Sequence, residues 1–225
     1  TGVLNVARTH EMQTNFLLQL GQQPMLTFVS VGTAKGEYFA ASRPPVGEER
    51  DKPRLLQAME AEGIPIEAIT PQNEPLNRGN SASLFMGWEE QLSFVRDALG
   101  PKLKETGLKT KIYAFDHNYN YDNMLEQQGY PMKIYEDENA ASFLTGAAYH
   151  NYGGDREELN NVNGKFPDKE LIFTETSIGM WNDGRNLEKR LMEDMEETAL
   201  GTVNNWCKAV IVWNLMLDNE RGPNR

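Results

Sequence analysis

The sequence predicts an α/β fold of the (β/α)8 TIM-barrel type, of which five strands can be read. Three observations support this prediction. From Gly63 onward, short and continuously apolar runs alternate with helical or loop segments, as in a parallel sheet that is buried on both faces. The centres of these runs recur about every 36 residues, close to the ~31 residues per unit of a barrel of about 250 residues. Polar side chains gather where the runs end, which is where such barrels place catalytic groups.

Each expected element has its own signal. A short apolar helix at 54–62 stops at Gly63, because glycine adopts the left-handed conformation that ends a helix at little cost. Apolar residues spaced three and four apart predict a helix at 85–99, and a second long helix is expected at 187–206. The last strand is expected at 209–217. The central residues of the five strands are Ile69, Ala114, Ala148, Phe173 and Val212.

The first 53 residues follow this pattern poorly. They contain one possible helix at 11–20 and one possible strand at 25–31. Residues 42–53 combine prolines, glycine and dense charge, which is typical of a loop or linker. We therefore expect a poorly matched N-terminal segment, residues 1–53, followed by the C-terminal part of a barrel, residues 54–225.

Composition excludes several classes of function. The 33 acidic and 22 basic residues give a net charge of -11. No cluster of Lys and Arg is present to bind phosphates, so we expect no nucleic-acid partner. The residues Cys, His, Asp and Glu lack the paired short spacings of a structural zinc site, and we expect neither a metal nor a cofactor. Cys207, the only cysteine, is expected to be a small buried side chain. No apolar run is long enough to span a bilayer.

Two glutamates stand where apolar runs end. Glu74 follows the run at Ile69, and Glu175 closes the run that begins at Leu171. Hydrolysis of a glycosidic bond with retention needs a carboxylic acid to protonate the leaving oxygen and a carboxylate roughly 5 to 5.5 Å away to attack the anomeric carbon. A single glutamate at a strand end is usually a solvated residue, so the prediction rests on the pair. Because Pro75 follows Glu74, its backbone is expected to be extended.

The alternative fold is an open, doubly wound sheet. The nucleotide sites of such sheets normally have a glycine-rich turn after an early strand. The sequence contains neither a GxGxxG motif nor a Walker loop, and the pair Gly153-Gly154 is too short to count as one. The barrel is therefore favoured, although periodicity alone leaves the open sheet possible.

Four motifs occur in order along the chain. They are Thr-Pro-Gln-Asn-Glu-Pro at 70–75, Ala-Tyr-His-Asn-Tyr-Gly-Gly at 148–154, Phe-Thr-Glu-Thr-Ser at 173–177 and Val-Trp-Asn-Leu-Met-Leu-Asp at 212–218. With these motifs, residues 55–225 resemble glycoside hydrolase family 30. That family includes glucosylceramidases and endo-β-1,6-glucanases, which are retaining enzymes on a (β/α)8 barrel. The resemblance implies that the readable strands are about 3 or 4 to 8.

The resemblance also implies roles for individual residues. Glu74 would be the acid/base and Glu175 the nucleophile. Asn73 would bind the sugar 2-hydroxyl, a tyrosine would orient the nucleophile, and Trp213 would stack on the sugar ring. The other substrate-binding residues would be Asp116, His117, Asn118, Tyr149, His150, Tyr152, Trp181 and Asn214. The pKa of Glu74 is expected to be raised by apolar surroundings and a neighbouring negative charge, while hydrogen bonds keep Glu175 ionised.

The resemblance fails upstream, where the Trp-rich stretch that the family carries near strand 3 is not found. We therefore expect a fragment of a longer enzyme that acts on a carbohydrate partner, a β-glucan or β-glucoside, in a secreted or periplasmic location. The alternative is a catalytically silent truncated barrel or a carbohydrate-binding remnant. An incomplete barrel exposes sheet edges, which favours aggregation over binding.

Overall fold

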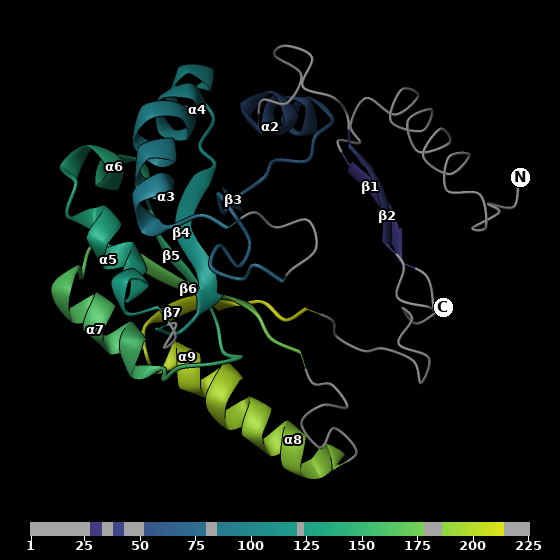
Figure 1. Cartoon of the computed structure of the whole chain (residues 1–225), viewed down its shortest axis with the longest axis vertical. Helices are drawn as coiled ribbons and strands as arrows, with labels where there is room; N and C mark the ends of the chain where they lie inside the picture. Colours follow the sequence, from purple (N-terminus) through teal and green to yellow (C-terminus); the bar gives the residue numbers. More distant parts are fainter. Residues whose placement is uncertain are drawn as a thin grey trace, which may run out of the picture. The chain divides into compact units, whose positions relative to one another are not determined.

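The structure is a computed structural model of the chain, and it describes residues 28–32, 38–42, 52–79, 85–120, 124–177 and 186–213 (Figure 1). The chain divides into two compact units, Thr1–Pro65 and Ile66–Arg225. No helix in these described ranges combines the length and the apolar character needed to cross a membrane.

The first unit contains a hairpin and a helix. Strand β1 (Phe28–Gly32) pairs antiparallel with β2 (Tyr38–Ser42) and overlaps the strand expected at 25–31, whose first three residues lie outside the described ranges. Helix α2 (Lys52–Ala61) begins two residues before the expected start at 54. Gly63 follows it with φ +77°, the left-handed conformation expected of that glycine. The helix expected at 11–20 lies outside the described residues.

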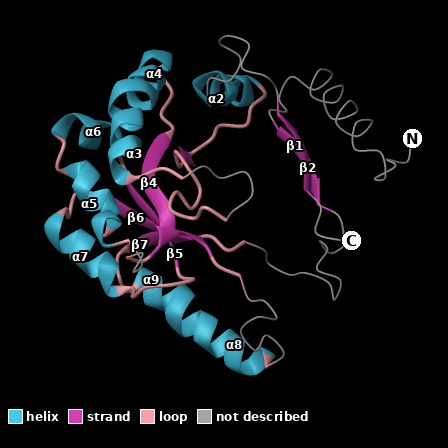
Figure 2. Cartoon of the chain, viewed as in Figure 1, coloured by secondary structure: helices cyan, strands magenta, loops and turns pink. Residues whose placement is uncertain are grey.

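The second unit is built on one parallel sheet of five strands in the order β3-β4-β5-β6-β7. The strands are β3 (Ala68–Ile69), β4 (Lys111–Asn118), β5 (Gly146–His150), β6 (Glu170–Glu175) and β7 (Cys207–Val210). Figure 2 shows the strands gathered together with the helices along their outer side. The predicted alternation of parallel strands and helices is confirmed, and neighbours in sequence are neighbours in the sheet.

Helical segments connect the strands. They are α3 (Trp88–Phe94), η2 (Val95–Leu99), α4 (Gly100–Thr106), η3 (Leu125–Gln127), α5 (Tyr130–Tyr135), α6 (Glu138–Phe143), α7 (Glu157–Lys165), α8 (Leu187–Asp194), η5 (Met195–Leu200) and α9 (Gly201–Val203). Segments α3 to α4 and α8 to α9 each run on without a break, so the helices expected at 85–99 and 187–206 are confirmed with shifted ends. Each contains a π-helical stretch, η2 or η5, a feature that often marks functional sites.

The last strand was expected at 209–217, of which residues 214–217 lie outside the described residues. Strand β7 begins at Cys207, which is buried and lies opposite Leu171 of β6. Residues 211–213 are described but belong to no strand, and their side chains are exposed. The strand ends at Val210 opposite Phe173, but the backbone N–H groups of Ile211 and Trp213 still donate to the carbonyls of Phe173 and Thr176 at 2.8 and 2.9 Å.

Alternate strand residues face opposite sides of the sheet. One side carries a small cluster of Tyr113, Ala148 and Ile172, with Ala68 packed against it. On the other side, the ring of Tyr149 lies against those of Phe115 and Tyr119, and its hydroxyl faces the carboxyl of Glu158 in α7. Both sides of the sheet are therefore packed along the middle of the strands, and a site can form where the strands end.

Candidate active site

A bulge in β4 prepares the site. The register of β4 against β5 shifts between Phe115 and His117, and both Phe115 and Asp116 have positive φ, +74° and +68°. The displaced backbone N–H of Phe115 donates to the side-chain oxygen of Gln91 at 2.8 Å, and Gln91 is fully buried in α3. A buried N–H without an acceptor would destabilise the fold, so the hydrogen bond to Gln91 stabilises the bulge. The bulge redirects Asp116 to the open side of the sheet.

The carboxylate of Asp116 joins four strand ends. Its Oδ2 accepts from the hydroxyl of Thr70 after β3 at 2.6 Å, and its Oδ1 accepts from that of Thr174 in β6 at 2.6 Å. Nε2 of His150, at the end of β5, lies 3.1 Å from Oδ1. Asp116 is 6% exposed and His150 is fully buried, so these contacts form a closed polar layer beneath the rim.

Glu74 lies on this layer. Its backbone N–H donates to the carbonyl of Asp116 at 2.9 Å, and its Oε2 accepts from Asn77 at 2.8 Å. Its Oε1 is 3.6 Å from Nδ1 of His150. The backbone of Glu74 has φ +44°, so the expectation of an extended conformation is wrong. The following proline disfavours the right-handed helical region, and the left-handed region satisfies it while the bond to Asp116 holds the residue there.

Glu175 ends β6 on the same rim. A register shift between Tyr149 and His150 places His150 opposite Glu175. The hydroxyl of Tyr152 donates to Oε1 of Glu175 at 3.1 Å and also lies 3.2 Å from the hydroxyl of Ser177. Burial raises the pKa of Tyr152 to about 12, so this hydroxyl remains a donor at neutral pH. Tyr152 is therefore the tyrosine that contacts the carboxyl of Glu175.

The two glutamates have opposite pKa shifts, and both run against expectation. Contact with His150 lowers the pKa of Glu74 more than burial raises it. Burial raises the pKa of Glu175, and the nearby negative charges of Glu74 and Asp116 add to that effect. The prediction that the pKa of Glu74 is raised overlooked His150, whose positive charge lies beside the carboxylate of Glu74.

The two histidines of the rim also differ. Burial lowers the pKa of His150, but the carboxylates of Asp116 and Glu74 outweigh it and raise that pKa to about 9. Burial lowers the pKa of His117 to about 4, and its neighbouring carboxylates do not compensate. At neutral pH, His150 is therefore a buried cation and His117 a neutral ring.

Glu74, His117 and His150 form the one group of metal-ligating side chains found in the described ranges, with ligand atoms within 4.8 Å of one another. Imidazole and carboxylate ligands suit Zn²⁺. However, His150 directs Nε2 to Asp116 and Nδ1 to Glu74, so its two nitrogens already bridge two carboxylates. This arrangement suits a group that holds a proton.

Comparison with known proteins identifies the family. The model of the glycosyl hydrolase family 30 TIM-barrel domain matches residues 52–225. The chain belongs to glycosyl hydrolase family 30. It is therefore a glycosidase by lineage, and its five parallel strands are part of the (β/α)8 barrel of that family.

Relatives within family 30 agree with this assignment. The chain is 32% identical over 176 residues to endo-1,6-beta-D-glucanase BGN16.3 of Trichoderma harzianum, covering 76% of this chain and 32% of that protein. It is 30% identical over 173 residues to an endo-1,6-beta-D-glucanase of Neurospora crassa, covering 76% and 33%. The chain spans about a third of the length of these curated relatives.

Two solved structures superpose on the chain. The endo-beta1,6-glucanase BT3312 is 72% identical, with a TM-score of 0.73 over 76% of this chain and 38% of that one. SrfJ from Salmonella typhimurium is 26% identical, with a TM-score of 0.66 over 82% and 41%. The predicted family and barrel fold are both confirmed.

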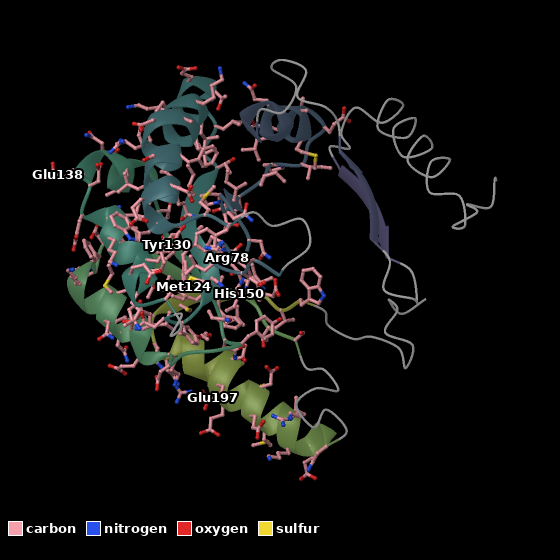
Figure 3. The ribbon with its side chains drawn as sticks, in the orientation of Figure 1. Arg78, Met124, Tyr130, Glu138, His150 and Glu197 are labelled. Carbon is pink, nitrogen blue, oxygen red and sulfur yellow. The ribbon has the colours of Figure 1, made fainter. Side chains whose placement is uncertain are left out.

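The structure brings most of the predicted site residues to one rim. In Figure 3, His150 lies at the middle of the side chains on the sheet. Asn118 follows the Asp116 bulge and accepts the backbone N–H of Tyr152 at 3.0 Å, and Asn73 is exposed beside Glu74. Trp213 is 66% exposed just beyond β7, and its backbone N–H donates to the carbonyl of Thr176. Trp181 and Asn214 lie outside the described residues.

Tyr149 is not brought to the rim. It precedes His150 in β5 and therefore faces the opposite side of the sheet, where it is fully buried. Strand alternation, applied to the motif at 148–154, could have separated Tyr149 from its neighbours. Tyr149 belongs to the helix-covered core.

Several residues of the site escaped the sequence prediction. Thr70 and Thr174 anchor Asp116, Asn77 binds Glu74, and Gln91 supports the bulge. The two threonines lie inside the motifs at 70–75 and 173–177, and Thr174 shares the strand face of Ile172. Gln91 gave a different signal, since it is a polar residue among the apolar positions of the helix at 85–99.

Proposed function

We propose that this chain carries the catalytic pair of a retaining glycoside hydrolase that cleaves β-glucosidic bonds, with Glu74 as acid/base and Glu175 as nucleophile. The observation that supports this most directly is the arrangement of the two carboxyl groups. They come from the ends of β3 and β6, both interact with His150, and their pKa values shift in opposite directions. A double displacement needs one carboxyl group that is protonated and one that is ionised when the substrate is bound.

In the first step, a carboxylate oxygen of Glu175 attacks the anomeric carbon, and the bond from that carbon to the glycosidic oxygen breaks. The leaving oxygen takes a proton from Glu74, so the leaving sugar departs as a neutral alcohol. Tyr152 donates to Oε1 of Glu175 at 3.1 Å, which leaves Oε2 to form the glycosyl ester.

Glu74 and His150 together hold the proton for this step. In the free site the proton lies on His150, which is flanked by Asp116 at 3.1 Å and Glu74 at 3.6 Å. A bound sugar displaces water from the rim and makes the separated charges of His150 and Glu74 more costly. The proton then moves to Glu74, and His150 becomes neutral.

In the second step, Glu74 is ionised and acts as a base. It accepts a proton from a water molecule whose oxygen attacks the anomeric carbon, and the ester bond to Glu175 breaks. The carboxylate of Glu175 is restored, and the sugar leaves with its original configuration after two inversions. No metal or redox cofactor takes part in this sequence.

The proposed substrate is a β-1,6-linked glucan. Three curated relatives and the 72% identical structure are named as endo-1,6-β-glucanases. Relatives named as putative glucosylceramidases are 27% and 28% identical, below the glucanases at 32% and 30% but above the one at 25%. A β-glucoside of the glucosylceramide type is therefore the weaker choice.

The experiment is to incubate the purified chain with a β-1,6-glucan and with a fluorogenic β-glucoside, and to follow the anomeric configuration of the first product by NMR. We expect the β-anomer. Azide should restore turnover of the activated glucoside in both variants with different products: Glu74→Ala should give the β-glucosyl azide, because azide attacks the ester of Glu175 in place of water, and Glu175→Ala the α-glucosyl azide, because azide displaces the leaving group directly. An α-anomer as first product, or the same azide product from both variants, would refute the assignment.

A second candidate is a chain that binds sugar without cleaving it. Two edges of the described sheet favour it, because β3 pairs with β4 alone and β7 with β6 alone among the described strands. A barrel with open edges positions its rim less firmly than a closed one. Sugar binding by the wild-type chain, without product release from either substrate, would support this candidate over the hydrolase.

A further inference from the structure

A cavity lies behind the rim that carries Glu74 and Glu175. It has a volume of about 310 Å³ and is lined by Tyr119, Asn151, Gly154, Asp155, Arg156 and Glu197. This volume is at the lower end of the range of small-ligand sites. None of these six residues belongs to the proposed mechanism. Glu197, labelled in Figure 3, comes from the π-helical stretch η5 on the long helix.

The cavity and the catalytic rim use neighbouring residues of the same strand ends. Asn118 and Tyr152 hydrogen-bond to each other on the catalytic side, and Tyr152 donates to Glu175. Tyr119, which follows Asn118, and Asn151, which precedes Tyr152, line the cavity. Because successive residues of an extended chain point in opposite directions, the two sites lie back to back.

The shape of the cavity is fixed by close backbone approach. Gly154 has φ +81°, and a Cβ atom there would lie 1.6 Å from the carbonyl oxygen of Tyr119. Across the cavity, Arg156 donates to the carboxylate of Glu197 at 2.7 Å, and Asn151 donates to the hydroxyl of Thr198 at 3.1 Å. The walls are therefore tied to both the sheet and the helix.

The chemistry of the lining fits a neutral ligand with many hydroxyl groups. One guanidinium, two carboxylates, one amide and one phenol supply both donors and acceptors. Arg156 offsets one of the two acidic groups, so the lining is poorly suited to a strongly charged ligand. Tyr119 is only 3% exposed, and within the described residues its buried hydroxyl has no hydrogen-bond partner. Buried hydroxyl groups normally have one.

We propose that this cavity is a second carbohydrate site, which holds a single hexose unit back to back with the catalytic centre. The choice of glucose as the hexose rests on the proposed function, whereas the existence of the site rests on the cavity alone. A sugar bound there would contact Asn151, whose chain neighbours are His150 and Tyr152. Occupancy would therefore be sensed at the residues that hold Glu74 and Glu175.

The test is an NMR titration of the ¹⁵N-labelled full chain with D-glucose and with the β-1,6-linked disaccharide gentiobiose. We expect saturable shifts of the amides of Asn151, Gly154 and Glu197 at millimolar sugar. The same shifts should persist in Glu175→Gln, which shows that they arise from binding and not from turnover. Shifts confined to Asn118, His150 and Tyr152 would overturn the second site and leave the proposed function intact.

Substitutions give the decisive comparison. Tyr119→Phe removes only the buried hydroxyl and should weaken sugar binding at the cavity about 2- to 10-fold. Tyr135→Phe is the matched control, because it also removes a buried hydroxyl without a described partner but lies away from the cavity. Equal affinities in the two variants would refute the assignment. Shifts produced by CaCl₂ and not by sugar would also overturn it, since they would identify a cation site.

Discussion

Strand β6 begins and ends with a glutamate, and its two ends show how position decides what a carboxylate does. At the first end, Glu170 accepts from the hydroxyl of Tyr113 at 2.6 Å and from Lys208 at 2.9 Å, and Lys111 lies 3.7 Å away. These contacts lower the pKa of Glu170, which is kept as a paired anion. At the other end, Glu175 has a neutral hydroxyl as its hydrogen-bond donor and a raised pKa.

The difference follows the general division of labour in parallel barrels. The amino ends of the strands carry groups that stabilise the fold, and the carboxyl ends carry groups that react. Glu170 is in direct contact with two lysines, whereas the described contacts of Glu175 include no lysine or arginine, and burial raises its pKa more than the charge of His150 lowers it, in keeping with its proposed role as nucleophile. Substitutions at matched positions of the two ends can test this comparison directly.

The largest effect is expected from the nucleophile. Glu175→Gln keeps the shape of the side chain but removes the charge that attacks the anomeric carbon. We expect turnover of a fluorogenic β-glucoside to fall on the order of 10³-fold or more, with folding retained in circular dichroism. Glu170→Gln, on the same strand, should change turnover by less than about twofold. Equal losses in the two variants would contradict the division between the two ends.

The next effect concerns pH and the stability of the rim. The pKa of His150 is about 9 in the folded chain and about 6.5 when unfolded, so its contribution is fully present below pH 6.5 and is lost as pH rises through 9. We expect the free energy of unfolding to fall by up to about 3 kcal/mol over this window. Urea titrations across the window measure it, with His150→Gln as control. An equally steep fall in that variant would assign the pH dependence to other groups.

His150→Gln should also change catalysis. The variant removes the proton shared with Glu74, and we expect kcat/KM to fall about 10²-fold. In the wild-type chain kcat/KM should decline above pH 9 as His150 loses its proton, and below the raised pKa of Glu175 as the nucleophile is protonated. The variant should lose the decline near pH 9 and decline instead at the lower pH at which Glu74 itself loses its proton. His117→Gln should keep the decline near pH 9, because burial holds the pKa of His117 near 4.

Two glycines allow the backbone to be compared between the amino ends and the carboxyl ends of the strands. Gly154 and Gly107 both have positive φ, but a Cβ at Gly154 would meet the carbonyl of Tyr119, whereas nothing lies within 4 Å at Gly107. Gly107→Ala should cost about 1 kcal/mol, the cost of the left-handed conformation. Gly154→Ala should cost roughly 3 kcal/mol, because the loop must also move. Thermal unfolding of the two variants measures the difference, and equal costs would mean that the loop yields freely.

The smallest effect is expected at the amino end. Glu170→Gln weakens the contacts to Lys208 and Lys111 but keeps an acceptor for Tyr113. Partly exposed pairs of this kind contribute little, so we expect a loss of about 1 kcal/mol in the free energy of unfolding. The loss should shrink at high salt, since screening already weakens these pairs in the wild-type chain.

Sequence reasoning reached the strands and the two glutamates because both depend on local patterns. Apolar runs with polar ends gave the five strands, and the spacing of motifs gave Glu74 and Glu175 a common rim. It missed α7 because residues 157–165 contain three asparagines and a glycine, which are weak helix formers, and buried Leu159 and Val162 hold the helix through tertiary packing.

The proton states of the site could not be predicted in the same way. They depend on a bulge that turns Asp116 toward His150, and a bulge leaves no regular mark in the sequence. The pKa of Glu74 was therefore assigned the wrong direction. Tyr149 was misplaced for a different reason, since strand alternation was not applied within the motif at 148–154.

The hydrogen bond from Phe115 to Gln91 has a practical consequence for anyone who wishes to redesign this enzyme lineage. Helix α3 packs on the outer side of the sheet, where substitutions are usually expected to leave a site unchanged. However, its Gln91 holds the β-bulge that orients Asp116. Replacing Gln91 during repacking of α3 would release the backbone of Phe115 and so shift the neighbouring Asp116. Remote mutations on α3 that impair turnover while sparing substrate binding would have their origin at this contact.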